Sequence, residues 1–165
     1  MAFGGKEEFP PLLGLGFHKM TLAGVRALCV GKFPNSITRP SIMDGLDVVV
    51  SRLNGTGFPL EIWIDGSFVT EKYNPEDSDV AVRVPGEIFD AAPPSQQNDL
   101  LWFASTDLKP DYKCDLYVFP EYGTGHSLYD HGQWRRAYWL TKFGFSRAEE
   151  PKGLAVLETP YVVSP

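Results

Sequence analysis

A short acidic motif follows an apolar segment near the middle of this 165-residue chain. Asp77 and Asp79 stand two residues apart, at the start of the alternating segment 79–84. Because alternate residues of a strand point to the same face, both carboxylates can aim at one point. Gly66 and Ser67 end the apolar run 60–64, and a glycine lets the backbone approach a ligand closely. Paired acids near a Gly-Ser turn favour the binding of a metal-bound phosphate.

A third carboxylate, Asp115, lies in another strand-like segment, residues 113–119. Neighbouring strands lie about 4.8 Å apart, so Asp115 on an adjacent strand reaches the same point. Three carboxylates this close repel one another and would otherwise hold protons. A divalent cation would remove that conflict, which is the physical reason to expect a metal ion if Asp77, Asp79 and Asp115 come together.

The order and spacing of these residues resemble the signature of the polymerase β-type nucleotidyltransferase superfamily. In that signature a Gly-Ser after a strand is followed by a spacer of about ten residues and an Asp-x-Asp that leads into a strand. Here nine residues separate Gly66-Ser67 from Asp77-Ser78-Asp79, and Asp115 matches the superfamily's third acid. The resemblance covers about residues 60–120, and both ends of the chain are similar to small bacterial and phage members.

The resemblance implies an α/β composition, α+β in its segregation, with a small mixed sheet backed by helices as in minimal nucleotidyltransferases. It implies transfer of a nucleoside monophosphate from an NTP, with ATP expected, to a hydroxyl of a protein or small RNA acceptor. Relatives of this size act in toxin–antitoxin and phage-defence systems. Two Mg²⁺ ions are expected on Asp77, Asp79 and Asp115, with Mn²⁺ as the alternative ion, and Asp115 would also accept the proton of the attacking hydroxyl.

The phosphates of the NTP would be bound by the N–H groups of Gly66 and Ser67 and by the Ser67 hydroxyl. Lys72 is the cation that we place beside them. Four further candidates for the departing pyrophosphate, which the sequence does not separate, are Lys113, Arg135, Arg136 and Lys152.

Taken singly, each residue has a simpler interpretation. Gly66-Ser67 is an ordinary turn, Asp77 is a turn residue after Pro75, and Asp115 pairs with Lys113 on an exposed strand. Asp65 is expected to be a turn or capping residue rather than a ligand. The competing function is a non-catalytic nucleotide-binding or antitoxin-like module, whose apolar arm and aromatic helix contact a partner protein or a second copy. The complete set of three acids argues against that module, because a pure binder does not need them.

Length and composition predict one domain over residues 1–165, with residues 1–19 as an irregular arm. The net charge of −6 argues against a dedicated nucleic-acid surface but leaves room for a local basic patch. Cys29 and Cys114 are expected to be buried thiols in a reducing compartment. No leader sequence and no apolar run of about 18 residues is visible, so a cytoplasmic protein without a membrane partner is expected.

The periodicity of apolar residues predicts the elements that position these acids. Strands are expected over residues 60–64, 79–84, 114–119 and 152–158. Helices are expected over 21–30, 40–54, 94–105 and 129–143, with a helical turn at 87–92. Thr21 is the expected cap of the first helix. The last helix is rich in aromatic residues, which favours a core or interface, with base stacking as the alternative.

Overall fold

A computed structural model describes residues 7–161 and places their strands in one five-stranded mixed sheet. The strands are β1 (Phe17–Lys19), β2 (Glu61–Asp65), β3 (Ser78–Pro85), β4 (Cys114–Glu121) and β5 (Leu154–Glu158). Their order across the sheet is β1-β5-β2-β3-β4. β2 runs antiparallel to β3 and β5, whereas β3 is parallel to β4 and β1 is parallel to β5.

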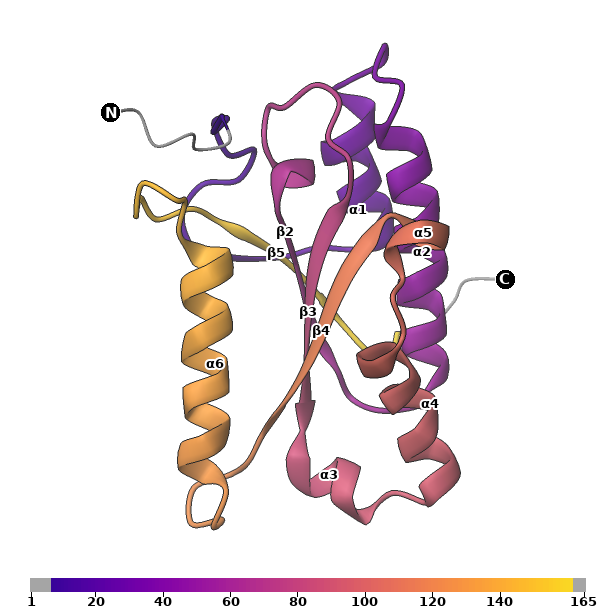
Figure 1. The fold of residues 1–165 in the computed structure, drawn as a ribbon, viewed down its shortest axis with the longest axis vertical. Helices are drawn as coiled ribbons and strands as arrows, with labels where there is room; N and C mark the ends of the chain where they lie inside the picture. Colours follow the sequence, from indigo (N-terminus) through magenta and orange to yellow (C-terminus); the bar gives the residue numbers. More distant parts are fainter. Residues whose placement is uncertain (1–6, 162–165) are drawn as a thin grey trace.

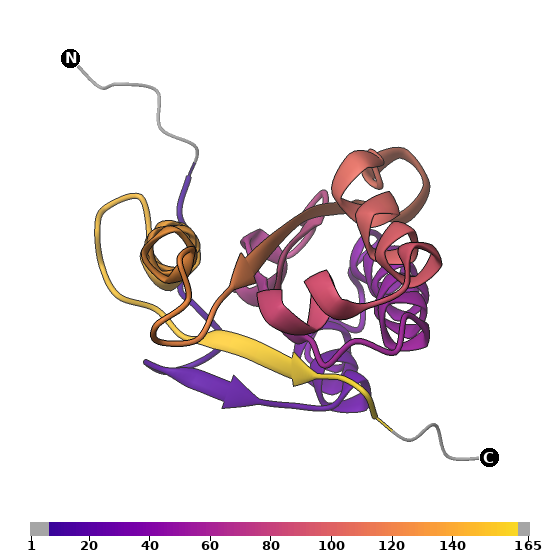
Figure 2. The same cartoon turned by 90° about the horizontal axis from the view of Figure 1, so that it is seen from below.

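Helices lie on both faces of this sheet (Figures 1 and 2). They are α1 (Leu22–Arg26), the π-helical turn η1 (Ala27–Gly31), α2 (Arg39–Gly55), the 3₁₀ turn η2 (Ser67–Val69), α3 (Gly86–Ala91), α4 (Pro94–Ser105), α5 (Lys109–Tyr112) and α6 (Tyr129–Gly144). α6 stands on one side of the sheet, and α2 and α4 lie on the other side. The predicted α+β architecture, a small mixed sheet backed by helices, is confirmed.

The alternation of the central strands divides the apolar residues between two cores. Ile62 and Ile64 of β2, with Val80 and Val82 of β3, pack on the side of α2. A smaller cluster lies under α6 and consists of Trp63, Ala81, Phe119, Phe143, Leu154 and Val156. Because strand residues alternate between faces, the two cores share the same strands.

The N-terminal part of the chain is more regular than the sequence suggested. Residues 17–19, placed in the irregular arm, form the edge strand β1 against β5, and the Phe17 ring lies 5.4 Å from that of Trp63. Residues 1–6 of the arm lie outside the described residues. Thr21 caps α1 as predicted, because its hydroxyl accepts the N–H of Gly24.

Both cysteines are buried free thiols, as predicted. Within residues 7–161, no helix combines the length and the apolar character that crossing a membrane requires.

Arg39, the first residue of α2, is fully buried and fastens the loop that follows β2. Its guanidinium donates hydrogen bonds to the carbonyl oxygens of Cys29 (2.8 Å), Phe68 (2.7 Å), Thr70 (2.6 Å), Lys72 (2.5 Å) and Tyr73 (3.3 Å). It also lies over the Phe33 ring, 3.7 Å from the centroid. Burial lowers the pKa of Arg39. Four of these carbonyls belong to the loop between β2 and β3, so one side chain fixes its path.

We expect Arg39→Met to lower the free energy of unfolding by about 3–5 kcal/mol, because it leaves several inward-facing carbonyls without donors. The matched control is Arg26→Met, which removes an exposed guanidinium that pairs with Asp44 and Asp47 and should cost less than about 1 kcal/mol. Urea denaturation followed by circular dichroism measures both. Equal losses in the two variants would contradict a fastening role for Arg39.

Candidate functional site

Three carboxylates form a row across the sheet at the end where β2 finishes. Asp65 of β2 stands opposite Asp79 of β3, and Asp79 stands opposite Asp115 of β4. All three belong to the strand positions that alternate with the α2-side core, so they lie on the face of α6. Because adjacent strands are about 4.8 Å apart, these acids are neighbours. The predicted proximity of Asp79 and Asp115 is confirmed by this register.

Asp77 joins the row through a lysine that the sequence analysis missed. Asp77 precedes the first residue of β3, and the Nζ atom of Lys109 lies 2.8 Å from Asp77 Oδ2 and 3.3 Å from Asp115 Oδ2. The two acids raise the pKa of Lys109, so its ammonium stays charged. Lys109 therefore provides a positive charge between two of the three predicted metal ligands.

Lys109 reaches this place because α5 packs tightly against α2. A side chain on Gly45 of α2 would place its Cβ 2.1 Å from the carbonyl oxygen of Tyr112, so only glycine fits there. Pro110 lies in the first turn of α5, a position that proline favours, but nothing in the sequence connects Lys109 with Gly45.

Asp65 and Lys152 pair with each other, and this corrects the sequence-based expectation for Asp65. Asp65 is the last residue of β2 rather than a turn or capping residue. Its carboxylate lies 2.7 Å from Lys152 Nζ, and both side chains are largely buried, with 5% and 16% exposed. Burial raises the pKa of Asp65 to about 6, and the charge of Lys152 limits that rise. Lys152, a candidate for the pyrophosphate, is thus engaged by Asp65.

Asp79 is the carboxylate in the least favourable electrostatic position. Burial raises its pKa most, and the charges of Asp77, Asp65 and Asp115 raise it further, to about 7. No ion pair holds the Asp79 side chain in the part of the chain that the structure describes, whereas Asp65, Asp77 and Asp115 each face a lysine. The repulsion that the sequence predicted among these acids is centred on Asp79.

Gly66 lies directly against Asp79. Its φ of +82° is a conformation that favours glycine, and an added Cβ would lie 2.0 Å from Asp79 Oδ2. Ser67 follows as the first residue of η2. Gly66 is therefore brought together with the acids, as predicted. The Lys72 ammonium forms no ion pair with the residues described, and its contribution to the site stays a prediction.

The donor chemistry of this row fits a hard divalent cation, since every ligand is a carboxylate oxygen. Among residues 7–161, however, no group of three or more His, Cys, Asp or Glu side chains stands in a ready-made metal arrangement. Asp77 and Asp115 instead lie against the Lys109 ammonium. A cation at this place requires Lys109 to move aside, and the predicted Mg²⁺ or Mn²⁺ remains a prediction.

The remaining candidates lie away from the acids or serve other contacts. Lys113 has left-handed backbone dihedrals, and its carbonyl accepts the N–H of Ser78. Arg136 lies on α6 near Glu121, 4.0 Å away, and near the Trp63 ring. His18 and His126 make local hydrogen bonds with Gly14 and Leu128.

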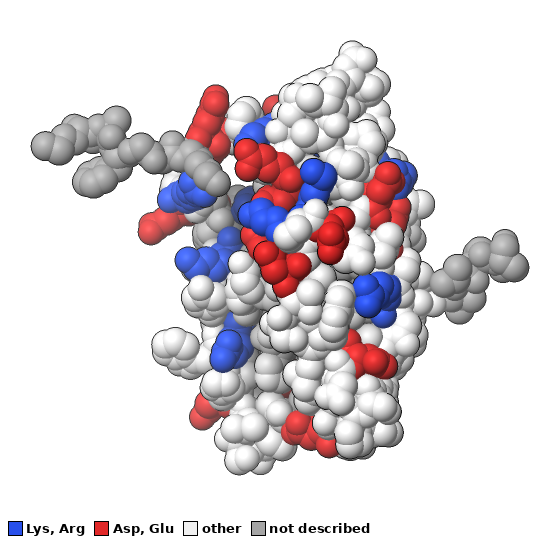
Figure 3. Space-filling model, turned by 45° about the vertical axis from the view of Figure 1, so that its right-hand side comes forward, with Lys and Arg blue, Asp and Glu red and all other residues white. Residues whose placement is uncertain are grey.

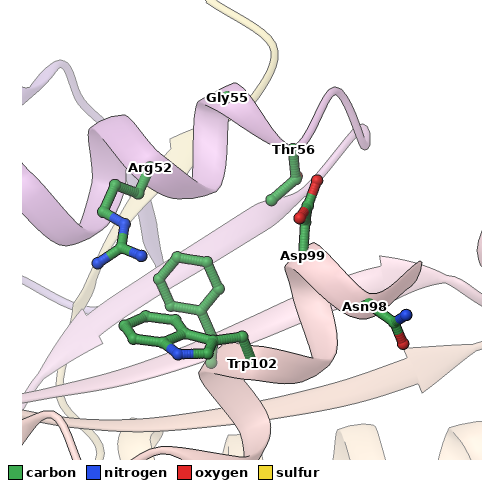
Figure 4. Close-up of a pocket in the computed structure, with 7 residues that line it drawn as sticks. Arg52, Gly55, Thr56, Asn98, Asp99 and Trp102 are labelled. Atoms are coloured by element: carbon green, nitrogen blue, oxygen red, sulfur yellow. The ribbon is translucent and has the colours of Figure 1, made fainter. Parts of the chain in front are cut away.

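A surface pocket of about 500 Å³ lies at the opposite end of β2, between α2 and α4 (Figure 4). Its lining residues are Arg52, Gly55, Thr56, Asn98, Asp99, Trp102 and Phe103. The Arg52 guanidinium already covers Trp102, 4.1 Å from the ring centroid. The pocket brings together no group of acids, so the acid row is the better candidate site.

In Figure 3, acidic and basic side chains intermix on the upper half of the molecule, whereas the lower half is mostly uncharged.

The fold and the site define a small α+β protein with four carboxylates and two lysines at one end of a mixed sheet. Residues 6–158 match a family of unknown function, DUF6932, and the chain belongs to this family. No curated protein and no solved structure matches the chain.

The raised pKa of Asp79 makes the stability of the protein dependent on pH. An acid whose pKa is higher in the folded than in the unfolded state destabilises the fold once it ionises, so stability falls as pH rises from about 4 to about 7. We expect Asp79→Asn to raise the free energy of unfolding at pH 8, without divalent ions, by on the order of 2 kcal/mol. Denaturant titrations at about pH 4 and at pH 8 measure this gain, which should be much smaller at pH 4 because the carboxyl is then partly protonated in the unfolded state too.

The matched control is Asp99→Asn, which changes an exposed acid on α4 and should leave stability nearly unchanged at both pH values. A destabilised Asp79→Asn variant at pH 8 would contradict the electrostatic assignment.

Proposed function

We propose that the protein is a metal-dependent nucleotidyltransferase that moves a nucleoside monophosphate, AMP as the expected case, from an NTP to an acceptor hydroxyl. The observation that carries the proposal is the direct register of Asp79 with Asp115 on parallel strands, with Asp77 joined to Asp115 through Lys109. Carboxylates this close together at one end of neighbouring strands repel one another, and a shared cation would relieve this repulsion. The Gly-Ser turn beside them supplies backbone donors of the kind that bind phosphate.

Asp77, Asp79 and Asp115 would hold the divalent ions, which would neutralise phosphate charge and polarise the phosphorus under attack. Gly66 and Ser67 would bind the outer phosphates, because the missing Cβ lets the backbone lie against Asp79 without a clash. Lys109 and Lys72 are the cations that would balance the departing pyrophosphate.

Asp115 would accept the proton of the acceptor hydroxyl. It is the most exposed of the paired acids, with 37% of its side chain accessible compared with 18% for Asp77 and 5% for Asp65. An incoming hydroxyl can therefore reach it from solvent. Asp65, held by Lys152 in the interior, would keep the end of β2 in place.

The acceptor is a protein or an RNA, and action within a toxin–antitoxin or phage-defence system is part of the same proposal. The competing function, a nucleotide-binding or antitoxin-like module without catalysis, contacts a partner through the apolar arm and α6 and predicts no covalent product.

We expect incubation with α-labelled NTPs, Mg²⁺ and cell lysate to give a labelled product, with ATP as the preferred donor. The double variant Asp77→Asn with Asp79→Asn should reduce labelling by about a thousandfold or more, because both proposed metal ligands lose their charge. Asp99→Asn on α4 is the matched control and should label as well as the wild type. Digestion of the product with RNase or protease identifies the acceptor class.

The outcomes separate the two functions. Mg²⁺-dependent NTP binding without transfer would favour the non-catalytic module. Absence of both binding and transfer would overturn the assignment of the Gly-Ser turn as a phosphate site.

We expect Lys109→Met to strengthen Mn²⁺ binding by roughly tenfold in the absence of nucleotide, because removing one competing ammonium near paired acids is worth about 1.4 kcal/mol. Electron paramagnetic resonance of free Mn²⁺ measures the affinity. Lys19→Met removes the same charge from an exposed pair with Glu158 of β5. Because Glu158 lies opposite Glu61, at the other end of β2 from Asp65, this change should alter the affinity little. Weaker binding in Lys109→Met would show that Lys109 does not occupy the place of the cation.

A further inference from the structure

The charge of the chain is unevenly distributed, and one segment is basic. Residues 131–147 contain four of the 15 Lys and Arg residues and none of the 21 Asp and Glu residues. These four are Arg135, Arg136, Lys142 and Arg147. The segment forms most of α6 and the start of the loop that follows it. The net charge of −6 therefore conceals a local basic surface in an otherwise acidic protein.

Aromatic and basic side chains share the outer face of α6. Trp134 is 80% exposed and Tyr138 is 50% exposed, although both are large and apolar. Arg135 and Lys142 are exposed on the same helix, and neither forms an ion pair within residues 7–161. Because residues four apart are neighbours on a helix, Trp134, Tyr138 and Lys142 follow one another along it. Figure 1 shows α6 apart from the other helices, and several basic side chains lie along the left side of Figure 3.

Stacked rings connect this outer face with the acid row. The Tyr138 ring contacts that of Trp139 edge-on, with centroids 4.9 Å apart, and Trp139 stacks on Tyr117 of β4 at 4.4 Å. Tyr117 is two residues from Asp115 on β4 and therefore on the same face of the sheet. A ligand lying along α6 would thus be led to the proposed proton acceptor.

We infer that the outer face of α6, formed by Trp134, Arg135, Tyr138 and Lys142, binds single-stranded RNA and leads a hydroxyl of that RNA to Asp115. Basic side chains between exposed aromatic rings suit a strand with free phosphates and unpaired bases, because every base can stack on a ring. A duplex hides its bases and would use the charges alone. RNA carries a hydroxyl on every ribose, which is the group that the transfer requires. The inference rests on the proposed function for its purpose, but RNA binding by α6 needs neither NTP nor catalysis.

The test is fluorescence anisotropy of the full chain with a labelled 12-nucleotide single-stranded RNA, without NTP, at several salt concentrations. We expect binding that weakens with salt, and preference over the same RNA in a duplex. Arg135→Gln with Lys142→Gln should reduce the slope of log K against log salt by about 1.4, since each phosphate contact contributes about 0.7. Trp134→Ala with Tyr138→Ala should weaken binding about fivefold or more while leaving the slope unchanged.

The controls match charge and exposure. Lys19→Gln with Lys32→Gln removes two positive charges elsewhere, and Ile37→Ala removes an apolar side chain that is 84% exposed. Thermal unfolding verifies that every variant is folded. No binding by the wild type, equal loss in the control variants, or equal affinity for the duplex would each overturn the inference. If the α-labelled NTP assay labels a protein while RNA fails to bind, the proposed transferase stands and the RNA acceptor does not.

Discussion

The candidate site depends on the buried guanidinium of Arg39. A cation in an apolar interior is normally paired with a carboxylate, because its lost hydration is otherwise costly. Here backbone carbonyls replace the carboxylate, and most of them belong to the loop between β2 and β3. That loop starts at Gly66 and ends beside Asp77. The loop cannot detach without exposing both the charge and its own unpaired carbonyls, so the two ends of the candidate site are held at a fixed separation.

The carboxylates of the candidate site have the same chemistry, but the charged residues beside them differ. Asp65 and Asp79 are directly opposite each other on neighbouring strands, yet Asp65 pairs with Lys152 whereas Asp79 faces other carboxylates. Asp65 is therefore a structural residue. Asp79 is a buried carboxylate without a lysine partner among the described residues. This asymmetry supports the proposal that Asp79 lies at the centre of a cation site. Membership of the DUF6932 family is compatible with such a site without assigning it.

The sequence predicted β2, β3 and β4 from their short apolar or alternating runs, and it predicted that Asp79 and Asp115 lie on two of these strands. It did not predict that Asp65 is the last residue of β2. It also predicted the Thr21 cap, whose hydrogen bond is local in the chain. Arg39 could not be predicted, since a charged residue at the start of a helix usually lies on the surface. Lys109 was missed because its position depends on a contact between α2 and α5. The net charge of −6 does not show that α6 is basic, because it averages this helix with an acidic remainder.

One helix supports both sides of the site. α2 begins at Arg39, whose guanidinium binds the carbonyls of the loop after Gly66-Ser67. Less than two turns later, Gly45 of the same helix packs against α5. The contact at Gly45 leaves α5 no room to slide toward α2. If the proposed cation binds, Lys109 would leave its place by rotation of its side chain, a motion of picoseconds to nanoseconds at an exposed residue. A site built in this way would respond to ions without a hinge, a lid or any movement of the backbone.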